Sequence, residues 1–339
     1  MLTARCNPVP QRPRPARLVP WVAVAFAFAC DPASPVPLFD LGHAGPYTVG
    51  VETLTFVDAA RGRSLLTEVW YPATEGGTPE TPLHLDAHTF RGAPPADGRF
   101  PLVLFSHAMQ SIRLQSYFLC ARLASEGFVV VAPDHPGTTF FDFAPSRLTP
   151  ALTDQPLDLS FLLDLLPVDP LVGEHADFER VAAVGHSLGG YAVLAIGAGH
   201  AKNAVPRDAR VKAVVALDAP LFKAPLASAP ATLMVSGTRD TVTPPPNQEA
   251  NHRDAASPKV LASFEGASHL APASNWCTIA DTAECHPPYR VGLDPYEALN
   301  ELTVDFLRMA LEGDAAASAR LADTEHRFAG FLHLRSDGL

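Results

Sequence analysis

Positive charge is scarce in this sequence. The 339 residues include 25 lysines and arginines against 36 aspartates and glutamates, which gives a formal net charge of -11 at neutral pH. Nucleic acids and anionic membrane surfaces attract proteins that present basic surfaces. No basic cluster follows the first 30 residues. The composition therefore argues against nucleic acid as a partner and against membrane contact through a basic face.

The N-terminal apolar run is short. It covers residues 18–29, follows four arginines, and no acidic residue precedes Asp31. A helix needs about 20 apolar residues to cross a bilayer, so a stable transmembrane anchor is the weaker interpretation. A charged segment followed by a short apolar run is the layout of an export signal. We expect such a signal over residues 1–30.

Cys30 directly follows this apolar run, in a context that resembles the cleavage site of a bacterial lipoprotein. The resemblance implies that Cys30 becomes a lipidated first residue, which would be the chain's only membrane contact. Plain secretion and an uncleaved N-terminal tail remain open. We expect an exported protein, either a lipoprotein of the cell envelope or a secreted or periplasmic protein. The Pro-rich residues 31–46 are interpreted as a linker.

Cysteine is also sparse, with five in the chain. Cys6 and Cys30 fall in the signal, and Cys120 lies in an amphipathic helical pattern that predicts a buried thiol. Cys277 and Cys285 stand in a Pro-rich loop, where an oxidising compartment would allow a disulfide; two reduced thiols are the alternative. Too few histidines stand near this pair at ligand spacing for a zinc site. No metal or other cofactor is expected.

Short apolar runs organise the chain from residue 47 onward. Residues 47–56 and 64–71 alternate with period two around a turn, which predicts an antiparallel hairpin. Six further runs are too continuously apolar for strands with one wet face: 101–105, 128–132, 181–184, 211–217, 231–235 and 260–264. Helical patterns occur at 111–126, 156–166, 188–199 and 295–311. This alternation predicts an α/β fold, with a mostly parallel central sheet and helices on both faces.

The domain boundaries follow from these patterns. We assign residues 47–312 to one catalytic domain and residues 313–339, a weak Ala-rich helical pattern and an unplaced tail, to a C-terminal extension. Two Pro-rich loops, 74–99 and 138–156, are the main insertions.

The motif Gly-His-Ser-Leu-Gly at 185–189 lies between an apolar β-type run and an apolar helical run. In this setting it predicts a nucleophile elbow, in which Ser187 sits on a strained turn between strand and helix. Glycines at the flanking positions let strand and helix approach where a Cβ would collide. The free N–H groups at the helix N-terminus would then favour an oxyanion formed when Ser187 attacks a carbonyl.

A serine nucleophile needs a histidine base that a carboxylate orients. Asp240 follows one predicted strand and His269 follows the next, in the order Ser, Asp, His that this fold requires. Asp218 also ends a strand after Ser187, so it remains the alternative acid; otherwise it caps a turn. His252 stands in a polar helical stretch, where we interpret it as a solvated surface residue.

An oxyanion hole needs two backbone donors. We predict the N–H groups of Leu188, next after the nucleophile, and of Met109, in the loop after the run 101–105. Within the insertion 138–156, three phenylalanines follow the carboxyl end of a strand, where open α/β sheets bind ligands. They either line an acyl pocket or lid, or pin the loop to the core: Phe140, Phe141 and Phe143.

With these residues placed, the chain resembles the α/β-hydrolase superfamily over about residues 47–312. It is most similar to bacterial predicted dienelactone hydrolases, platelet-activating-factor acetylhydrolases and polyester-degrading cutinases. The resemblance is carried by Phe-Ser-His-Ala at 105–108, Ala-Pro-Asp-His-Pro-Gly at 132–137, the elbow, and the segments around Asp218, Asp240 and His269. The cutinase-like match implies Asp240 as the acid, and the acetylhydrolase-like match implies Asp218. The family usually has glycine where this chain has Ala108, and dienelactone hydrolases proper use a cysteine nucleophile.

These features predict a serine carboxylic ester hydrolase that works through a Ser187-His269-Asp240 triad and a covalent acyl-enzyme. The expected substrates are small-molecule, lipid or polymer esters. One alternative is a lipid-active acetylhydrolase or acyltransferase on the same triad. A different class of function is a surface-binding lipoprotein without catalytic activity on the same scaffold.

Overall fold

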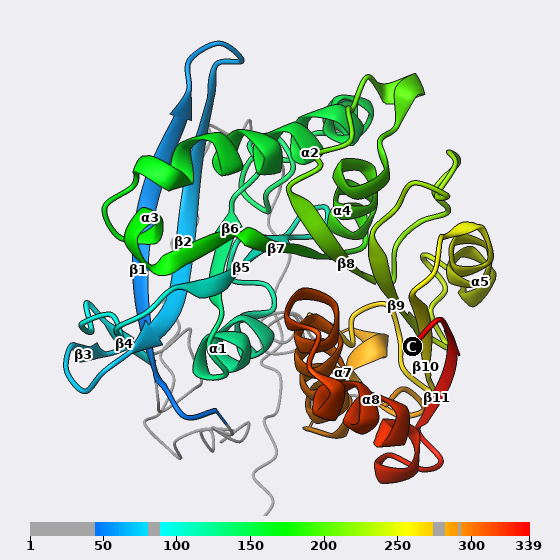
Figure 1. Ribbon diagram of the computed structural model, residues 1–339. Helices are drawn as coiled ribbons and strands as arrows, with labels where there is room; N and C mark the ends of the chain where they lie inside the picture. The colour runs from blue at the N-terminus through cyan, green and yellow to red at the C-terminus, as the bar shows by residue number, and fades with distance from the viewer. Residues whose placement is uncertain (1–44, 81–88, 274–281, 291–292) are drawn as a thin grey trace, which may run out of the picture. The chain divides into compact units, whose positions relative to one another are not determined.

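The computed structural model describes residues 45–80, 89–273, 282–290 and 293–339. These residues belong to one compact unit, Leu38–Leu339. Within them, 11 strands form a single sheet in the order β11-β10-β9-β8-β7-β5-β6-β2-β1-β4-β3 (Figure 1). The strands are β1 (Thr48–Asp58), β2 (Arg63–Ala73), β3 (Thr78–Pro79), β4 (Thr89–Arg91), β5 (Phe100–Ser106), β6 (Val129–Pro133), β7 (Ala176–His186), β8 (Val211–Leu217), β9 (Ala231–Gly237), β10 (Lys259–Phe264) and β11 (Leu332–Asp337).

The predicted hairpin and parallel sheet are both confirmed. β1 and β2 pair antiparallel from Thr48↔Ala73 to Asp58↔Arg63. The six strands from β10 to β6 in the sheet order pair parallel. β2 joins this parallel block antiparallel to β6.

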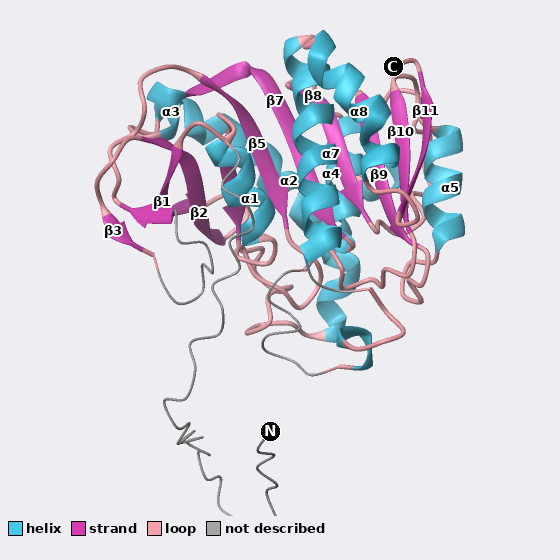
Figure 2. Ribbon diagram, turned by 90° about the horizontal axis from the view of Figure 1, so that it is seen from below, coloured by secondary structure: helices cyan, strands magenta, loops and turns pink. Residues whose placement is uncertain are grey.

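Helices cover both faces of the sheet (Figure 2). They are α1 (Tyr117–Ser125), α2 (Leu148–Leu165), α3 (Val172–His175), α4 (Leu188–Ala198), α5 (Pro245–Asp254), α7 (Leu293–Glu312) and α8 (Ala315–Arg327). Four short 3-10 helices add η1 (Pro145–Arg147), η2 (Leu166–Val168), η3 (Ala201–Asn203) and η4 (Ala283–Cys285). No helix in the described segments is both long and apolar enough to span a bilayer.

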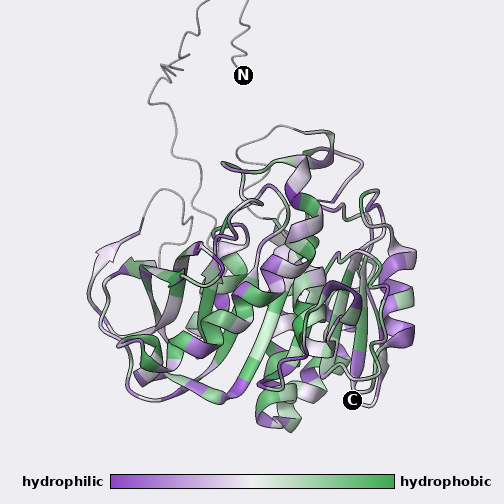
Figure 3. Ribbon diagram, turned by 90° about the horizontal axis from the view of Figure 1, so that it is seen from above, coloured by the Kyte–Doolittle hydropathy of each residue, from purple (hydrophilic) through white to green (hydrophobic). Residues whose placement is uncertain are grey.

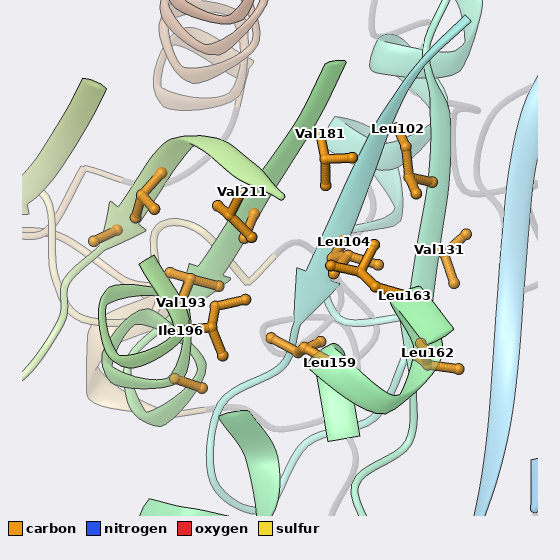
Figure 4. Packing of buried hydrophobic residues seen from close by; sticks show 14 of the residues in the cluster. Leu102, Leu104, Val131, Leu159, Leu162, Leu163, Val181, Val193, Ile196 and Val211 are labelled. Carbon is orange, nitrogen blue, oxygen red and sulfur yellow. The ribbon is translucent and has the colours of Figure 1, made fainter. Parts of the chain in front are cut away.

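The core consists of two apolar clusters, one on each face of the sheet. Successive side chains of a strand point to opposite faces, so Leu102 and Leu104 of β5 join one cluster while Val103 and Phe105 join the other. The first cluster packs α2 and α4 against the sheet, as Figure 4 shows for Leu159, Leu162, Val193 and Ile196. The second packs α1 and α7. Figure 3 shows the resulting hydrophobic strands between helices with hydrophilic outer faces.

Three sequence assignments need correction. The C-terminal residues 313–339 are no extension, because α8 packs on the second core cluster through Leu321 and β11 pairs antiparallel with β10. The insertion 138–156 is a loop only at first, since α2 begins at Leu148 and includes Pro156. The helix predicted from residue 111 begins at Tyr117, which leaves 111–116 as a loop.

The parallel strands bring separate loops to one edge of the sheet. β5, β7, β8, β9 and β10 end at Ser106, His186, Leu217, Gly237 and Phe264. Because parallel strands share one direction, all five carboxyl ends lie at the same edge, and the loops that follow them meet there.

Candidate active site

Ser187 lies on the sharp turn between β7 and α4. Its backbone has φ 54° and ψ -117°, a strained conformation for a residue other than glycine. A Cβ on Gly185 would stand 2.3 Å from the Gly189 carbonyl oxygen, and one on Gly189 would stand 2.0 Å from the Ser106 carbonyl oxygen. A residue with a Cβ at position 185 or 189 would therefore collide with these carbonyl oxygens. The turn therefore has the strain and the close packing of a nucleophile elbow.

His269 links Ser187 to Asp240. Its Nε2 lies 2.9 Å from Ser187 Oγ, and its Nδ1 lies 2.7 Å from Asp240 Oδ2. Asp240 and His269 are both buried. A carboxylate beside Nδ1 accepts a hydrogen bond from the Nδ1–H group, which keeps the ring proton there and leaves Nε2 as an acceptor for the serine hydroxyl. The three side chains that the sequence separates by 82 and 29 positions thus form one hydrogen-bonded chain.

The loop after β9 holds the Asp240 carboxyl in its ionised form. The N–H groups of Val242 and Thr243 donate to Oδ1 at 2.7 and 2.8 Å, and the Thr243 hydroxyl lies 2.7 Å from Oδ2. Burial works against ionisation, but hydrogen bonds from His269 and Thr243 outweigh it and hold the pKa of Asp240 below its usual value. Sequence analysis missed Thr243. The signal was available, because Asp followed by Thr three positions later is a pattern in which the carboxylate accepts local N–H groups.

Asp218 lies beside this chain but outside it. Its backbone has φ 44°, its side chain is buried, and its Oδ1 accepts the Gly237 N–H at 2.9 Å. Among the described residues no hydrogen bond joins Asp218 to His269 Nδ1, which Asp240 and Thr243 occupy. Burial and the neighbouring Asp240 charge raise the pKa of Asp218 well above its usual value. Burial and the Asp240 charge therefore favour the neutral form of the Asp218 carboxyl, whereas the hydrogen bonds of Asp240 favour its ionised form.

One group of described side chains has the spacing of metal ligands. Ligand atoms of His186, Asp218 and His269 lie within 4.8 Å of one another. Hydrogen bonds already engage both ring nitrogens of each histidine, to Gln115 and the His269 carbonyl for His186 and to Asp240 and Ser187 for His269. These contacts account for the cluster without an ion.

Residues 106–110, here called the oxyanion loop, begin at the last residue of β5 and lie against the elbow. The positive φ in this loop falls at Gln110, at 56°, and not at Ala108. A Cβ is therefore tolerated at Ala108. The Met109 and Leu188 N–H groups have no hydrogen-bond partner among the described residues, so both are available as donors.

Residues 138–143, which include Phe140, Phe141 and Phe143 and are here called the phenylalanine loop, pack beside the oxyanion loop. The Gln110 N–H donates to Thr138 O at 2.8 Å and the Phe140 N–H to Ser111 O at 3.0 Å. Phe140 is 60% exposed and Phe141 is 81% exposed, with their rings edge to face. These two side chains do not pin the loop to the core, so that alternative is wrong for them. Phe143 is half-buried.

The structure also shows where several of the predicted cysteines and His252 lie. Cys120 is buried as a free thiol, and burial raises its pKa. Cys285 is disulfide-bonded, while its predicted partner Cys277 and the predicted lipidation site Cys30 lie outside the described residues. His252 is buried on α5, so its interpretation as a solvated surface residue is wrong. The helical pattern is right, but α5 turns this polar residue inward.

Comparisons with known proteins agree with this architecture. Among solved structures, a ferulic acid esterase from Streptomyces cinnamoneus aligns with a TM-score of 0.66 at 23% identity, over 80% of this chain and 92% of that one. The fold is that of an α/β-hydrolase. The sequence model of the Chlorophyllase family matches residues 81–221 of this chain. No relative was found among curated proteins.

The family match covers the oxyanion loop and the elbow and ends just after Asp218. It does not reach Asp240 or His269. The arrangement of acid and base therefore rests on the geometry of the loops after β9 and β10.

Proposed function

We propose that this protein is a serine carboxylic ester hydrolase that works through a covalent acyl-enzyme. The observation that carries the proposal is the hydrogen-bonded chain from Ser187 Oγ through His269 to Asp240, with distances of 2.9 and 2.7 Å. A serine hydroxyl is a weak nucleophile at neutral pH, and a base within hydrogen-bond reach is what activates it. The similarity to the Chlorophyllase family and to a ferulic acid esterase supports an ester as the substrate.

In the first half of the reaction, Ser187 Oγ attacks the ester carbonyl while His269 Nε2 takes the hydroxyl proton. Asp240 holds His269 with its Nδ1 protonated and stabilises the imidazolium that forms. The Leu188 and Met109 N–H groups donate to the tetrahedral oxyanion. When the intermediate collapses, the ester C–O bond breaks, and His269 returns its proton to the leaving alcohol.

In the second half, water replaces the alcohol. His269 Nε2 takes a proton from water as its oxygen attacks the acyl-enzyme carbonyl, and the same two N–H groups hold the second oxyanion. Collapse breaks the bond to Ser187 Oγ, which regains the proton, and releases the carboxylic acid. Each step uses only groups of this chain, the ester and water.

An apolar substrate group fits the rim of the site. Exposed apolar side chains occur on the loops that follow β5, β6, β8 and β9: Met109, Phe140 and Phe141, Leu221, and Val242. Each loses unfavourable contact with water when an apolar acyl or alcohol group covers it. We therefore propose that Phe140 and Phe141 contact the apolar part of the ester.

The proposal is tested on protein that lacks residues 1–30. A fluorophosphonate probe should label the parent protein and leave Ser187→Ala unlabelled; equal labelling of both would remove Ser187 as the nucleophile. p-Nitrophenyl esters of graded chain length then measure the acyl preference. Added alcohol or amine that intercepts the acyl-enzyme more efficiently than water would identify an acyltransferase instead.

We also propose that the protein is exported. The arginines and apolar run of residues 1–30 support this, with Cys30 as the residue that would carry lipid. Expression of the full chain in a bacterial host, followed by fractionation and intact-mass analysis, tests it. A lipidated N-terminus at Cys30 supports the lipoprotein form, and an unprocessed protein in the cytoplasm contradicts export.

A further inference from the structure

Both hydrogen-bonding groups of Ala108 are engaged by side chains. The Ala108 N–H donates to Gln115 Oε1 at 2.8 Å, and the Ala108 carbonyl oxygen lies 2.7 Å from His107 Nδ1. Gln115 and His107 are 1% and 0% exposed. The centre of the oxyanion loop is therefore fixed on both sides by buried side chains, immediately before the proposed donor Met109.

The hydrogen bonds also determine the protonation of His107. The His135 N–H donates to His107 Nε2 at 3.0 Å, so that nitrogen is an acceptor and the ring proton is on Nδ1, facing the Ala108 carbonyl. Burial and the neighbouring His135 lower the pKa of His107 to about 3, which keeps the ring neutral.

This contact determines the direction of the Met109 N–H. The Ala108 carbonyl and the Met109 N–H belong to one planar trans peptide, in which the C=O and N–H bonds point in opposite directions. Holding the carbonyl toward His107 therefore holds the Met109 N–H away from it. A flipped peptide would lose the 2.7 Å contact and remove the donor.

Gln115 connects this loop to the elbow and to the base. Since its Oε1 accepts from Ala108, its Nε2 is the end that donates to His186 Nδ1, at 2.9 Å. His186 then carries its proton on Nε2 and donates to the His269 carbonyl at 2.8 Å. Burial and the neighbouring His269 lower the pKa of His186 to about 3, so this ring is also neutral. In the three hydrogen bonds that link Ala108, Gln115, His186 and His269, each N–H group therefore faces an oxygen or nitrogen that can accept.

We propose that Gln115 is a positioning residue that holds the oxyanion loop in its donating conformation and couples it, through His186, to the loop that carries His269. The inference rests on the proposed ester hydrolysis and adds a residue that the triad does not include. Gln115 acts through Ala108 and His186 and not on the substrate. Its loss should weaken stabilisation of the oxyanion and leave the proton transfer by His269 unchanged.

The first test is Gln115→Met, which keeps the length of the side chain and removes its hydrogen bonds to Ala108 and His186, together with the longer one, of 3.4 Å, from Nε2 to Ser116 Oγ. Loss of a whole oxyanion donor costs about 10² to 10³ in rate; here the N–H remains but is no longer held, so we expect kcat to fall about 10- to 100-fold. KM for a short p-nitrophenyl ester should change less than about twofold, because the ground-state ester makes little use of the donor. The pH midpoint of kcat/KM should stay in place, since the contacts of His269 with Asp240 and Ser187 are untouched.

A second readout separates this role from a purely structural one. An aryl trifluoromethyl ketone adds to the serine as a hemiketal oxyanion, so its affinity should fall by the same factor as kcat/KM. Gln248→Met is the matched control, because Gln248 is also fully buried and donates one hydrogen bond, to the Ala219 carbonyl at 3.0 Å. We expect the control to stay within about threefold of the parent protein in kcat and inhibitor affinity.

Gln115→Glu supplies a test that does not depend on the methionine variant folding. A protonated carboxyl can accept from Ala108 with one oxygen and donate to His186 Nδ1 with the other, whereas the ionised form has no proton for His186. The ratio of variant to parent kcat/KM, measured at each pH, should therefore rise as the pH falls. A ratio that is constant with pH contradicts the proposal.

Three further results would overturn it. These are a Gln115→Met kcat within twofold of the parent, a loss confined to KM or accompanied by a shifted pH midpoint, and an equal loss in Gln248→Met. Failure of the proposed function is seen separately, on the parent protein, as absence of ester hydrolysis and of labelling at Ser187 before any Gln115 variant is measured.

Discussion

Asp240→Asn and Asp218→Asn should have opposite consequences, although each replaces a buried carboxyl with an amide of the same shape. At position 240 the amide Oδ1 can still accept the Val242 and Thr243 N–H groups. Its NH2 group then faces His269 Nδ1, which must become an acceptor. The ring proton moves to Nε2, where it blocks transfer from Ser187.

A triad histidine in the wrong tautomer loses about 10⁴ in kcat, which corresponds to about 5.5 kcal/mol at 1.36 kcal/mol per factor of ten. We expect a loss of about 10³- to 10⁴-fold for Asp240→Asn. At position 218 the environment favours the neutral acid, because burial and the Asp240 charge raise the pKa of Asp218 well above its usual value. An amide there reproduces the neutral acid and can still accept the Gly237 N–H. We expect Asp218→Asn to keep kcat within about fivefold, since no charge is removed.

Both variants are measured with p-nitrophenyl acetate at neutral pH, with circular dichroism and thermal unfolding to verify that each is folded. Titration of the active serine with a fluorophosphonate gives the fraction of competent sites. If Asp218→Asn abolishes turnover and Asp240→Asn keeps most of it, the acid is Asp218, and the tautomer argument from His269 Nδ1 is wrong.

Three further predictions concern the same edge of the sheet. The Asp218 carboxyl binds a proton more tightly in the folded than in the unfolded state, so its contribution to the free energy of unfolding falls as the pH rises above the unfolded value near 3.8. Asp218→Asn should therefore raise the thermal midpoint more at pH 8 than at pH 5; a pH-independent difference contradicts this. Gly189→Ala places a Cβ 2.0 Å from the Ser106 carbonyl oxygen, which should lower the free energy of unfolding in urea by about 3 kcal/mol and abolish fluorophosphonate labelling, unless the backbone shifts without cost. Phe141→Ser should raise KM about 5- to 10-fold for an octanoyl ester and leave the acetyl ester unchanged, because only the longer chain reaches this 81% exposed ring. Equal effects on both esters would exclude an acyl contact.

Most of the sheet could be predicted from the sequence, because buried parallel strands must be apolar on both faces. The runs at 101–105, 181–184 and 211–217 are such strands, and each lies within an observed one. β11 was missed for the opposite reason. It is an edge strand that buries Leu332 and exposes much of the rest, and its partner β10 lies some 70 residues earlier. Neither its composition nor its neighbours in sequence indicate a pairing at that range.

The nucleophile elbow, the chain order of the triad and the positions of its loops could also be predicted, because each follows from a short motif or from the order of residues along the chain. A nucleophile turn needs glycines beside the serine, and chain order limits the acid and base to loops after later strands. Those rules accept Asp218 and Asp240 equally, since each follows a strand after Ser187.

The sequence alone therefore determined the fold class and the candidate catalytic groups: an α/β sheet, a serine on a strained turn, and a histidine with two possible acids. Tertiary structure decided which acid contacts the base. The strained turn at Asp218 places its carboxyl against the Gly237 N–H, while the Asp240 loop closes on its own carboxylate and presents it to His269. Tertiary structure also brought Gln115, which carries no motif, between Ala108 and His186. Hydrogen bonds between loops that follow different strands depend on distances of a few ångströms in three dimensions, and no spacing along the chain encodes them.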